Sequence, residues 1–296
     1  MWRFFATANH FPESASLNEI EARFRAQKLS GVVEKITEAG GHSIQLIAGG
    51  VSLKLYELAV AMPNPQPRQF HAIPMEDEAA RLIWLALESR VGKKNPIPTK
   101  KDWNELLSEL GAVRWSGLLE FRSYTAHGFI LIKDGEMQPG EFVIQNPSGF
   151  LKMDAAEQIP FEVTLLEAVP DSHAYQCFVL RKGITIWTDH LLIRCQEMIG
   201  RRMLQTIERE LNHSIEPWNW HITLKEDTLQ DAHFFPSMQE AANAYRAVFM
   251  GIGTQLNFFI GNNITQRILN ESFELLPAEE KNALNSQRLI PAAFTL

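Results

Sequence analysis

A pattern of serine, glycine, strand and turn occurs twice in the first two thirds of the chain. The first occurrence reads SGVVE and is followed by HSIQLIAGG, and the second reads SGLLE and is followed by HGFILIKDG. Self-similarity at a constant spacing indicates one structural unit used more than once. The residues that define the pattern are Ser30, Gly31 and Gly50 in the first copy, and Ser116, Gly117 and Gly135 in the second.

Each copy predicts a helix followed by a β-hairpin. Helical patterns at 17–29 and 103–110 end at the Ser-Gly pair, where glycine commonly supplies a left-handed helix cap. The turns are too short for a parallel crossover, so the strands are expected to be antiparallel. The two units are placed at about 17–92 and 101–186, and a third, weaker hairpin is expected at 161–183.

The rest of the chain has the periodicity of helices. One long helix is predicted over 189–212, and Ser237 with Glu240 forms a capping box that opens another helix. The predicted fold class is therefore α+β. An antiparallel, hairpin-built sheet from two or three related helix-hairpin units occupies residues 1–186, and a C-terminal helical bundle occupies 187–296.

Composition excludes several classes of protein. The net charge of −7 and the pI of about 5.8 argue against nucleic-acid binding, which needs a basic face. Residues 93–101 hold four lysines around two prolines, and we interpret them as a solvated connector; contact with a polyanion is the alternative. The chain lacks a signal-peptide pattern and a long apolar run, which indicates a cytoplasmic protein with no membrane span. No motif predicts a metal or another cofactor, and the two cysteines predict no disulfide framework.

Two positions of the pattern carry the same polar residue in both copies. His42 and His127 each follow the hairpin turn, and Glu34 and Glu120 each lie in the strand before it. An acid–base pair would require the copies to face each other across a cleft. We expect instead exposed turn histidines and a solvated strand face.

Aromatic residues between the predicted helices are the main candidates for a binding surface. The candidates are Phe234, Phe235, Trp218, Trp220 and His221. Exposed aromatics often anchor protein–protein interfaces, and the segment 231–236 is expected to be the most exposed part. Because large aromatic side chains are mostly buried in folded proteins, burial between sheet and bundle is nevertheless the favoured interpretation of the aromatic residues as a group, and an interface is the alternative.

The residues SGVVE with HSIQLIAGG, and SGLLEF with HGFILIKDG, resemble the bacterial DUF4388/PATAN-type module. The resemblance covers about twenty residues in each copy. It implies a non-enzymatic interaction module of bacterial signalling systems, including those of motility, type IV pili and differentiation. It implies no catalytic residue.

Three functions remain open at this point. The first is a cytoplasmic, non-catalytic interaction or scaffold protein that binds a protein partner, with a homo-oligomer as a further open partner class. The second is a hydrolase or transferase with its site between sheet and helices, lined by the same Trp218, Trp220 and His221, with Glu216 or Asp227 as the acid. The third is a small-molecule sensor.

Overall fold

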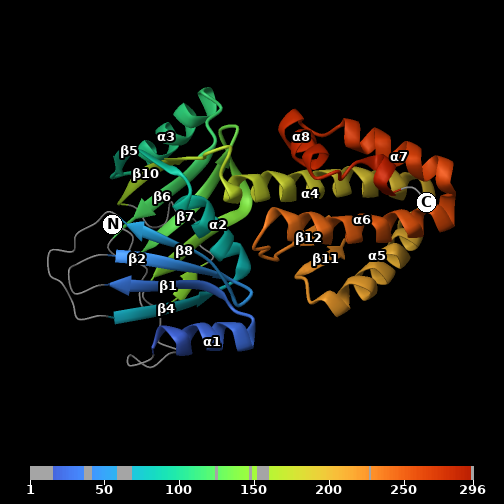
Figure 1. Cartoon of the computed structure of the whole chain (residues 1–296). Coiled ribbons are helices and arrows are strands. Elements are labelled where there is room, and N and C mark those ends of the chain that lie inside the picture. The colour runs from blue at the N-terminus through green and yellow to red at the C-terminus, as the bar shows by residue number, and fades with distance from the viewer. Residues whose placement is uncertain are drawn as a thin grey trace. The chain divides into compact units, whose positions relative to one another are not determined.

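The computed structural model in Figure 1 describes residues 16–36, 42–58, 69–123, 126–146, 149–151, 160–226 and 228–294. The chain divides into two compact units, Met1–Tyr175 and Gln176–Leu296. The first unit contains antiparallel sheets and the second is mainly helical. This confirms the α+β class with a helical C-terminal region, although the first unit has two sheets instead of one. The change from one unit to the next lies at 175/176, whereas the sequence placed it at 186/187.

The first sheet has the strand order β3-β2-β1-β4 and is antiparallel throughout. Its strands are β1 (Ser30–Ile36), β2 (His42–Ala48), β3 (Val51–Leu58) and β4 (Gln69–Met75). Helix α1 (Leu17–Gln27) covers one face of this sheet, because Ile20 and Phe24 pack against Val33 and Ile47. Ser16 and Glu19 form a capping box at the start of α1.

The second sheet has the order β5-β10-β6-β7-β8-β9 and is also antiparallel. Its strands are β5 (Arg90–Ile97), β6 (Gly117–Arg122), β7 (His127–Lys133), β8 (Glu136–Asn146), β9 (Gly149–Leu151) and β10 (Phe161–Glu167). Helix α3 (Lys100–Ala112) covers one face through Trp103, Leu106 and Leu110. Strand β7 is buried along its whole length, as its continuous apolar sequence predicts for a strand covered on both faces.

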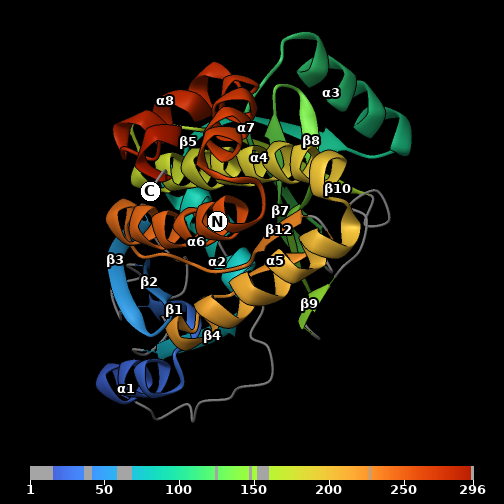
Figure 2. The same cartoon turned by 90° about the vertical axis from the view of Figure 1, so that its right-hand side faces the viewer.

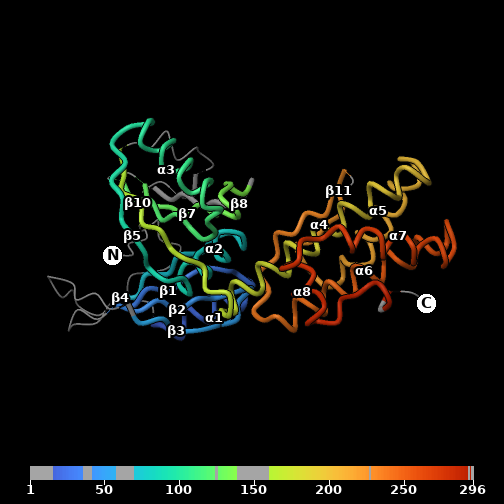
Figure 3. Tube along the Cα trace, turned by 90° about the horizontal axis from the view of Figure 1, so that it is seen from above, coloured from blue at the N-terminus to red at the C-terminus, as the bar shows by residue number. Residues whose placement is uncertain are grey.

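Helix α2 (Asp77–Leu87) lies between the two sheets and packs against β1 and β2 of the first and β7 and β8 of the second (Figures 1 and 3). Residues on several sides of this short helix are buried, among them Ala80, Ile83, Trp84 and Leu85. A helix that is apolar on several sides is one that is covered on several sides. The first unit is therefore layered as α1, first sheet, α2, second sheet and α3.

Two elements predicted for residues 1–186 are wrong. The first part of the lysine-rich segment expected to be a connector belongs to β5, an edge strand whose Lys94 forms an ion pair with Glu162 of β10, and Lys100 and Lys101 begin α3. The last strand of the expected third hairpin, 175–183, is part of helix α4 (His173–Ile199). A short apolar run does not distinguish a strand from a buried helix, and here Tyr175, Val179 and Gly183 lie on one buried helical stripe.

The second unit consists of most of α4 and the helices that follow, with α6 packed between α5 and α7 (Figure 2). These elements are α5 (Arg201–Ile215), η2 (Glu216–Trp218), β11 (Ile222–Lys225), β12 (Thr228–Asp231), α6 (Met238–Ile260), α7 (Asn262–Glu274), α8 (Ala278–Ser286) and η3 (Pro291–Phe294). Ser237 caps α6 as predicted. The single helix predicted over 189–212 is divided at Gly200, which has a φ of 77°.

The core of the second unit is centred on Trp187 of α4, which is fully buried. Its indole nitrogen donates hydrogen bonds to the Leu269 carbonyl oxygen at 3.2 Å and to Ser272 Oγ at 3.0 Å. Its ring lies against Phe249 of α6 and Phe273 of α7, with centroid distances of 4.3 and 4.9 Å. One side chain thus joins three helices.

Candidate functional site

Each Ser-Gly pair, Ser30–Gly31 and Ser116–Gly117, is called a Ser-Gly joint below. The serines of the two joints make the same contact. Ser30 Oγ accepts a hydrogen bond from the backbone N–H of Gly49 at 2.8 Å. Ser116 Oγ accepts one from the N–H of Asp134 at 2.9 Å. Gly49 and Asp134 each have a left-handed φ, of 51° and 52°; Gly49 lies in the turn between β2 and β3, and Asp134 in the turn between β7 and β8. Each serine therefore ties the start of one strand to the end of its neighbour.

The glycines after these serines, Gly31 and Gly117, are strand residues and not helix caps, so that prediction is wrong. Their φ values are 153° and 159°, and the left-handed residues that follow the helices are Lys28 and Arg114. A methyl group on Gly31 would overlap the carbonyl oxygen of Ile73 in β4. A methyl group on Gly117 would overlap the equivalent carbonyl oxygen in β10. Glycine is needed because two backbones approach closely.

Gly50 and Gly135 hold the hairpins against the preceding helices. Their N–H groups donate to the carbonyl oxygens of Leu29 and Trp115 at 2.7 and 2.8 Å. Their φ values are 84° and 85°, and a Cβ on Gly135 would lie 2.5 Å from the Cα of Gly111 in α3. The serines and glycines that define the repeated pattern therefore have structural roles in both sheets.

The equivalent glutamates and histidines are buried, which contradicts the expected solvated positions. Glu34 and His42 are 6% and 5% exposed, and Glu120 and His127 are 4% and 5% exposed. The Glu Oε1 to His Nε2 distance is 3.5 Å in the first sheet and 3.0 Å in the second. Both pairs lie on the sheet faces opposite α1 and α3, where α2 packs. The expectation failed because a second layer covers those faces.

Arg122 is a third member of the Glu120–His127 group in the second sheet. It was not identified from the sequence. Its guanidinium donates to the Glu120 carboxylate. Burial alone would raise the pKa of Glu120, but hydrogen bonds and charge from His127 and then Arg122 outweigh it and lower that pKa to about 2. In the first sheet the register places Ile36 where the second has Arg122. Alignment of the two copies reveals this difference.

A pocket of about 440 Å³ adjoins Arg122 at one end of the second sheet. Its lining is mostly apolar: Pro96, Ile97, Pro98, Arg122, Ser123, Pro160, Phe161 and Glu162. An apolar pocket with a few polar groups is the usual form of a small-molecule site. The pocket combines segments that are far apart in sequence, so sequence analysis did not find it.

The aromatic candidates of the second unit divide into buried and exposed residues. Phe234 and Phe235 are only 2% and 6% exposed, so they are core residues and the expectation that they are exposed is wrong. Phe235 packs against Tyr245 with a centroid distance of 5.6 Å. The hydroxyl of Tyr245 donates to Asp231 at 2.6 Å, which anchors β12 to α6.

Trp218 is the exposed member of the group, with 63% of its surface accessible. Its ring is stacked on Trp220, with centroids 5.2 Å apart and planes inclined by only 14°. Trp220 is half-buried and meets Phe235 edge-on at 6.4 Å. A chain of aromatic contacts therefore supports the exposed indole from the core.

Polar residues surround this stack. His221 is exposed, and its ring lies 5.5 Å from that of His233 between centroids. Glu216 is directed to His213, with Oε2 to Nδ1 at 3.6 Å. The other acid considered for an enzyme site, Asp227, lies outside the described residues.

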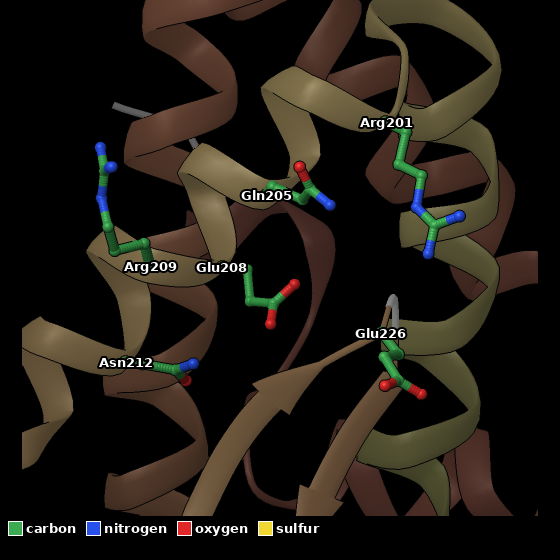
Figure 4. Close-up of a pocket in the computed structure, with 6 residues that line it drawn as sticks. All are labelled: Arg201, Gln205, Glu208, Arg209, Asn212 and Glu226. Carbon is green, nitrogen blue, oxygen red and sulfur yellow. The ribbon is translucent and has the colours of Figure 1, made fainter.

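A second, polar hollow of about 400 Å³ lies between α5 and the β11–β12 hairpin (Figure 4). Its lining holds two arginines, Arg201 and Arg209, and two glutamates, Glu208 and Glu226, together with Gln205 and Asn212. Asn212 joins the hairpin to the helix through two hydrogen bonds of 2.8 Å with the Leu224 backbone. Opposite charges balance across the hollow, so it selects no ligand charge.

Comparisons of the chain with protein-family models, with curated proteins and with solved structures give no match. In the part of the chain that the structure describes, no helix has the length and apolar character needed to cross a membrane.

Proposed function

We propose that this chain is a non-catalytic interaction protein of a bacterial regulatory system, acting in the cytoplasm. The matched Ser-Gly joints support a duplicated helix-and-hairpin scaffold in the first unit. The resemblance to PATAN-type modules supports a role in signalling. The partner surface is the Trp218 stack of the second unit, and this surface carries the proposal.

The Trp218 stack has the properties of an interface anchor. Tryptophan is enriched among the residues that dominate binding energy. Because Trp220 and Phe235 hold the indole in place, little side-chain freedom is lost on binding. A surface tryptophan without such contacts would lose more side-chain freedom on binding.

The charge around the stack indicates the chemistry of the partner. The side chain of Glu216, two residues before Trp218, is 78% exposed, and the whole chain carries a net charge of −7. A cation over an indole face gains about 0.5–2 kcal/mol. The partner is therefore a protein segment that presents arginine or lysine beside apolar side chains.

Site-specific photo-crosslinking tests this assignment. A photoreactive amino acid replaces Trp218 in the cells that naturally make the protein, and the same amino acid replaces Val113, which is 71% exposed on the first unit, as the control. Position 218 is expected to give a discrete crosslinked protein that is absent at position 113. Mass spectrometry should locate the crosslink beside an arginine or lysine.

A charge-reversal variant provides the second part of the crosslinking experiment. Glu216→Lys should reduce the yield of the crosslink about 10-fold, because the like charge opposes a cationic partner. Identical products at both positions, or no product at 218, would contradict the proposal. So would a crosslink only to a second copy of the chain, since the surface would then serve self-association.

A sensor function is the second candidate, favoured by the pocket beside Arg122. The lining, apolar except for Arg122, Ser123 and Glu162, suits an apolar molecule with a carboxylate. A ligand at 100 times its dissociation constant stabilises a protein by about 2.7 kcal/mol. Thermal shifts with a series of aliphatic and aromatic monocarboxylates should therefore detect it, and Phe161→Ala should remove the shift.

A further inference from the structure

The first sheet gathers two histidines and a glutamate on one face. Glu34 of β1 lies directly opposite His71 of β4 in the register, and His42 of β2 lies diagonally across from Glu34. Directly paired residues of antiparallel strands share a face of the sheet. This face is opposite the one that carries Val33 against α1, so all three side chains belong to the face covered by α2.

Two of these side chains are buried and carry polar atoms that make no hydrogen bond. Glu34 Oε1 and both ring nitrogens of His42 have no hydrogen-bond partner among the described residues. Both residues are more than nine-tenths buried. Buried polar groups in native proteins almost always have a partner, and an absent one often indicates an ion or water.

The second sheet shows what the first one lacks. There Glu120 is neutralised by Arg122 and contacted by His127. The first sheet has Ile36 in the register position of Arg122, and it has His71 where the second has Thr164. Compared with the second sheet, the first sheet therefore lacks the cationic side chain and has an additional imidazole beside its equivalent buried carboxylate.

We propose that the first sheet binds a divalent transition-metal ion, with zinc as the natural candidate, through His42 Nε2, the Glu34 carboxylate and His71. The Nε2 to Oε1 distance of 3.5 Å is close to the roughly 3.3 Å that separates two tetrahedral ligands about 2.0–2.1 Å from one zinc ion. Two imidazoles and a carboxylate are a common zinc ligand set.

His71 gives the ion a route of entry. It lies on β4, which is an edge strand of the first sheet, and it is half-buried. The described side chains of Glu34, His42 and His71 do not yet lie within ligand distance of one ion, so binding requires the His71 imidazole to rotate toward Glu34. The ion then supplies the positive charge that Arg122 supplies in the second sheet.

Cobalt titration of the tag-free, chelator-treated full chain tests the site. Co²⁺ replaces zinc and gives visible absorption bands in a tetrahedral site. One equivalent is expected to bind with these bands, and Zn²⁺ is expected to displace it. His71→Ala should weaken Co²⁺ affinity by at least about 10-fold, and Glu34→Gln and His42→Ala should weaken it as well.

The controls separate this site from other histidines and from misfolding. His221→Ala removes the exposed imidazole next to His233 and should leave the bands unchanged. His71 is half-buried on an edge strand, so His71→Ala is expected to keep the near-ultraviolet circular dichroism of the native chain. Absence of the bands in the native chain, or bands of full intensity and affinity in a folded His71→Ala variant, would overturn the proposal.

Discussion

Glu120 and His127 face each other inside the second sheet, with Glu120 Oε1 3.0 Å from His127 Nε2 and both side chains buried. Arg122, whose side chain is 25% exposed, donates to the same carboxylate from the solvent side. An ionised glutamate is retained there because two neighbours compensate the cost of removing it from water. The group therefore contributes to stability in a way that depends on pH.

The first prediction concerns this carboxylate. Its pKa falls from 4.5 to about 2 on folding, so its contribution is fully present above about pH 4.5 and is lost as the pH falls toward 2. Glu120→Gln should lower the free energy of unfolding at pH 7 by about 3–5 kcal/mol. The difference from the wild-type chain should shrink steadily in urea titrations between pH 5 and pH 3.

Glu162→Gln is the matched control for that experiment. Glu162 lies on the neighbouring strand β10, and its ion pair with Lys94 is half-exposed. Solvent screening limits such a pair to less than about 1 kcal/mol. A loss of equal size in both variants, or one that does not change with pH for Glu120→Gln, would contradict the assigned role of burial.

The second prediction compares two glycines near one joint. Gly117→Ala places a methyl group on the carbonyl oxygen of Leu166, at a φ of 159°, and should cost more than about 2 kcal/mol. Gly111→Ala lies in α3, where the new methyl group meets its nearest neighbour at 3.7 Å. It should be neutral or stabilising by up to about 1 kcal/mol, because alanine favours helix. Thermal unfolding of the two variants measures the contrast.

The third prediction concerns the serines of the joints. Ser30 is buried, so Ser30→Ala leaves the N–H of Gly49 without its acceptor and should cost about 1–3 kcal/mol. The N–H of Asp134 is exposed, so water can replace the hydroxyl after Ser116→Ala. That variant should lose less than about 1 kcal/mol in urea unfolding. Equal losses would show that the hydrogen bond is not the dominant effect.

The fourth prediction concerns the two thiols. Burial raises the pKa of Cys195 to about 12, whereas Cys177 is half-buried. A thiol reagent at pH 8 should label one cysteine of the native chain and both after unfolding in guanidinium. Cys177→Ser should remove the native-state reaction. Labelling of Cys195 in that folded variant would show that the core of the second unit opens readily.

Sequence periodicity predicted the fold class well where a pattern was long and capped. Ser237 and Glu240 predicted the start of α6, and Ser237 caps that helix. It failed at 175–183, because a short apolar run fits either a strand or a buried helix stripe. It also failed at β5, whose partner strand β10 lies far along the chain.

The candidate sites were harder to predict than the fold because burial is set by distant layers. His42 and His127 follow turns, yet α2 packs on the face that each occupies. Phe235 sits in an irregular segment, but Tyr245 and Trp220 enclose it. The equivalence of Glu34 and Glu120 was visible in the sequence, and only the register showed His71 beside the first of them.

Strand β5 has a consequence for how the chain is made on the ribosome. Its contact Lys94–Glu162 joins positions 68 residues apart, so β5 must wait for β10 to be synthesised. At about 5–20 residues per second, the wait lasts several seconds. During this interval two adjacent lysines, Lys93 and Lys94, and Pro96 oppose pairing of β5 with a neighbouring nascent chain. The lysine-rich sequence therefore protects the strand before its partner exists.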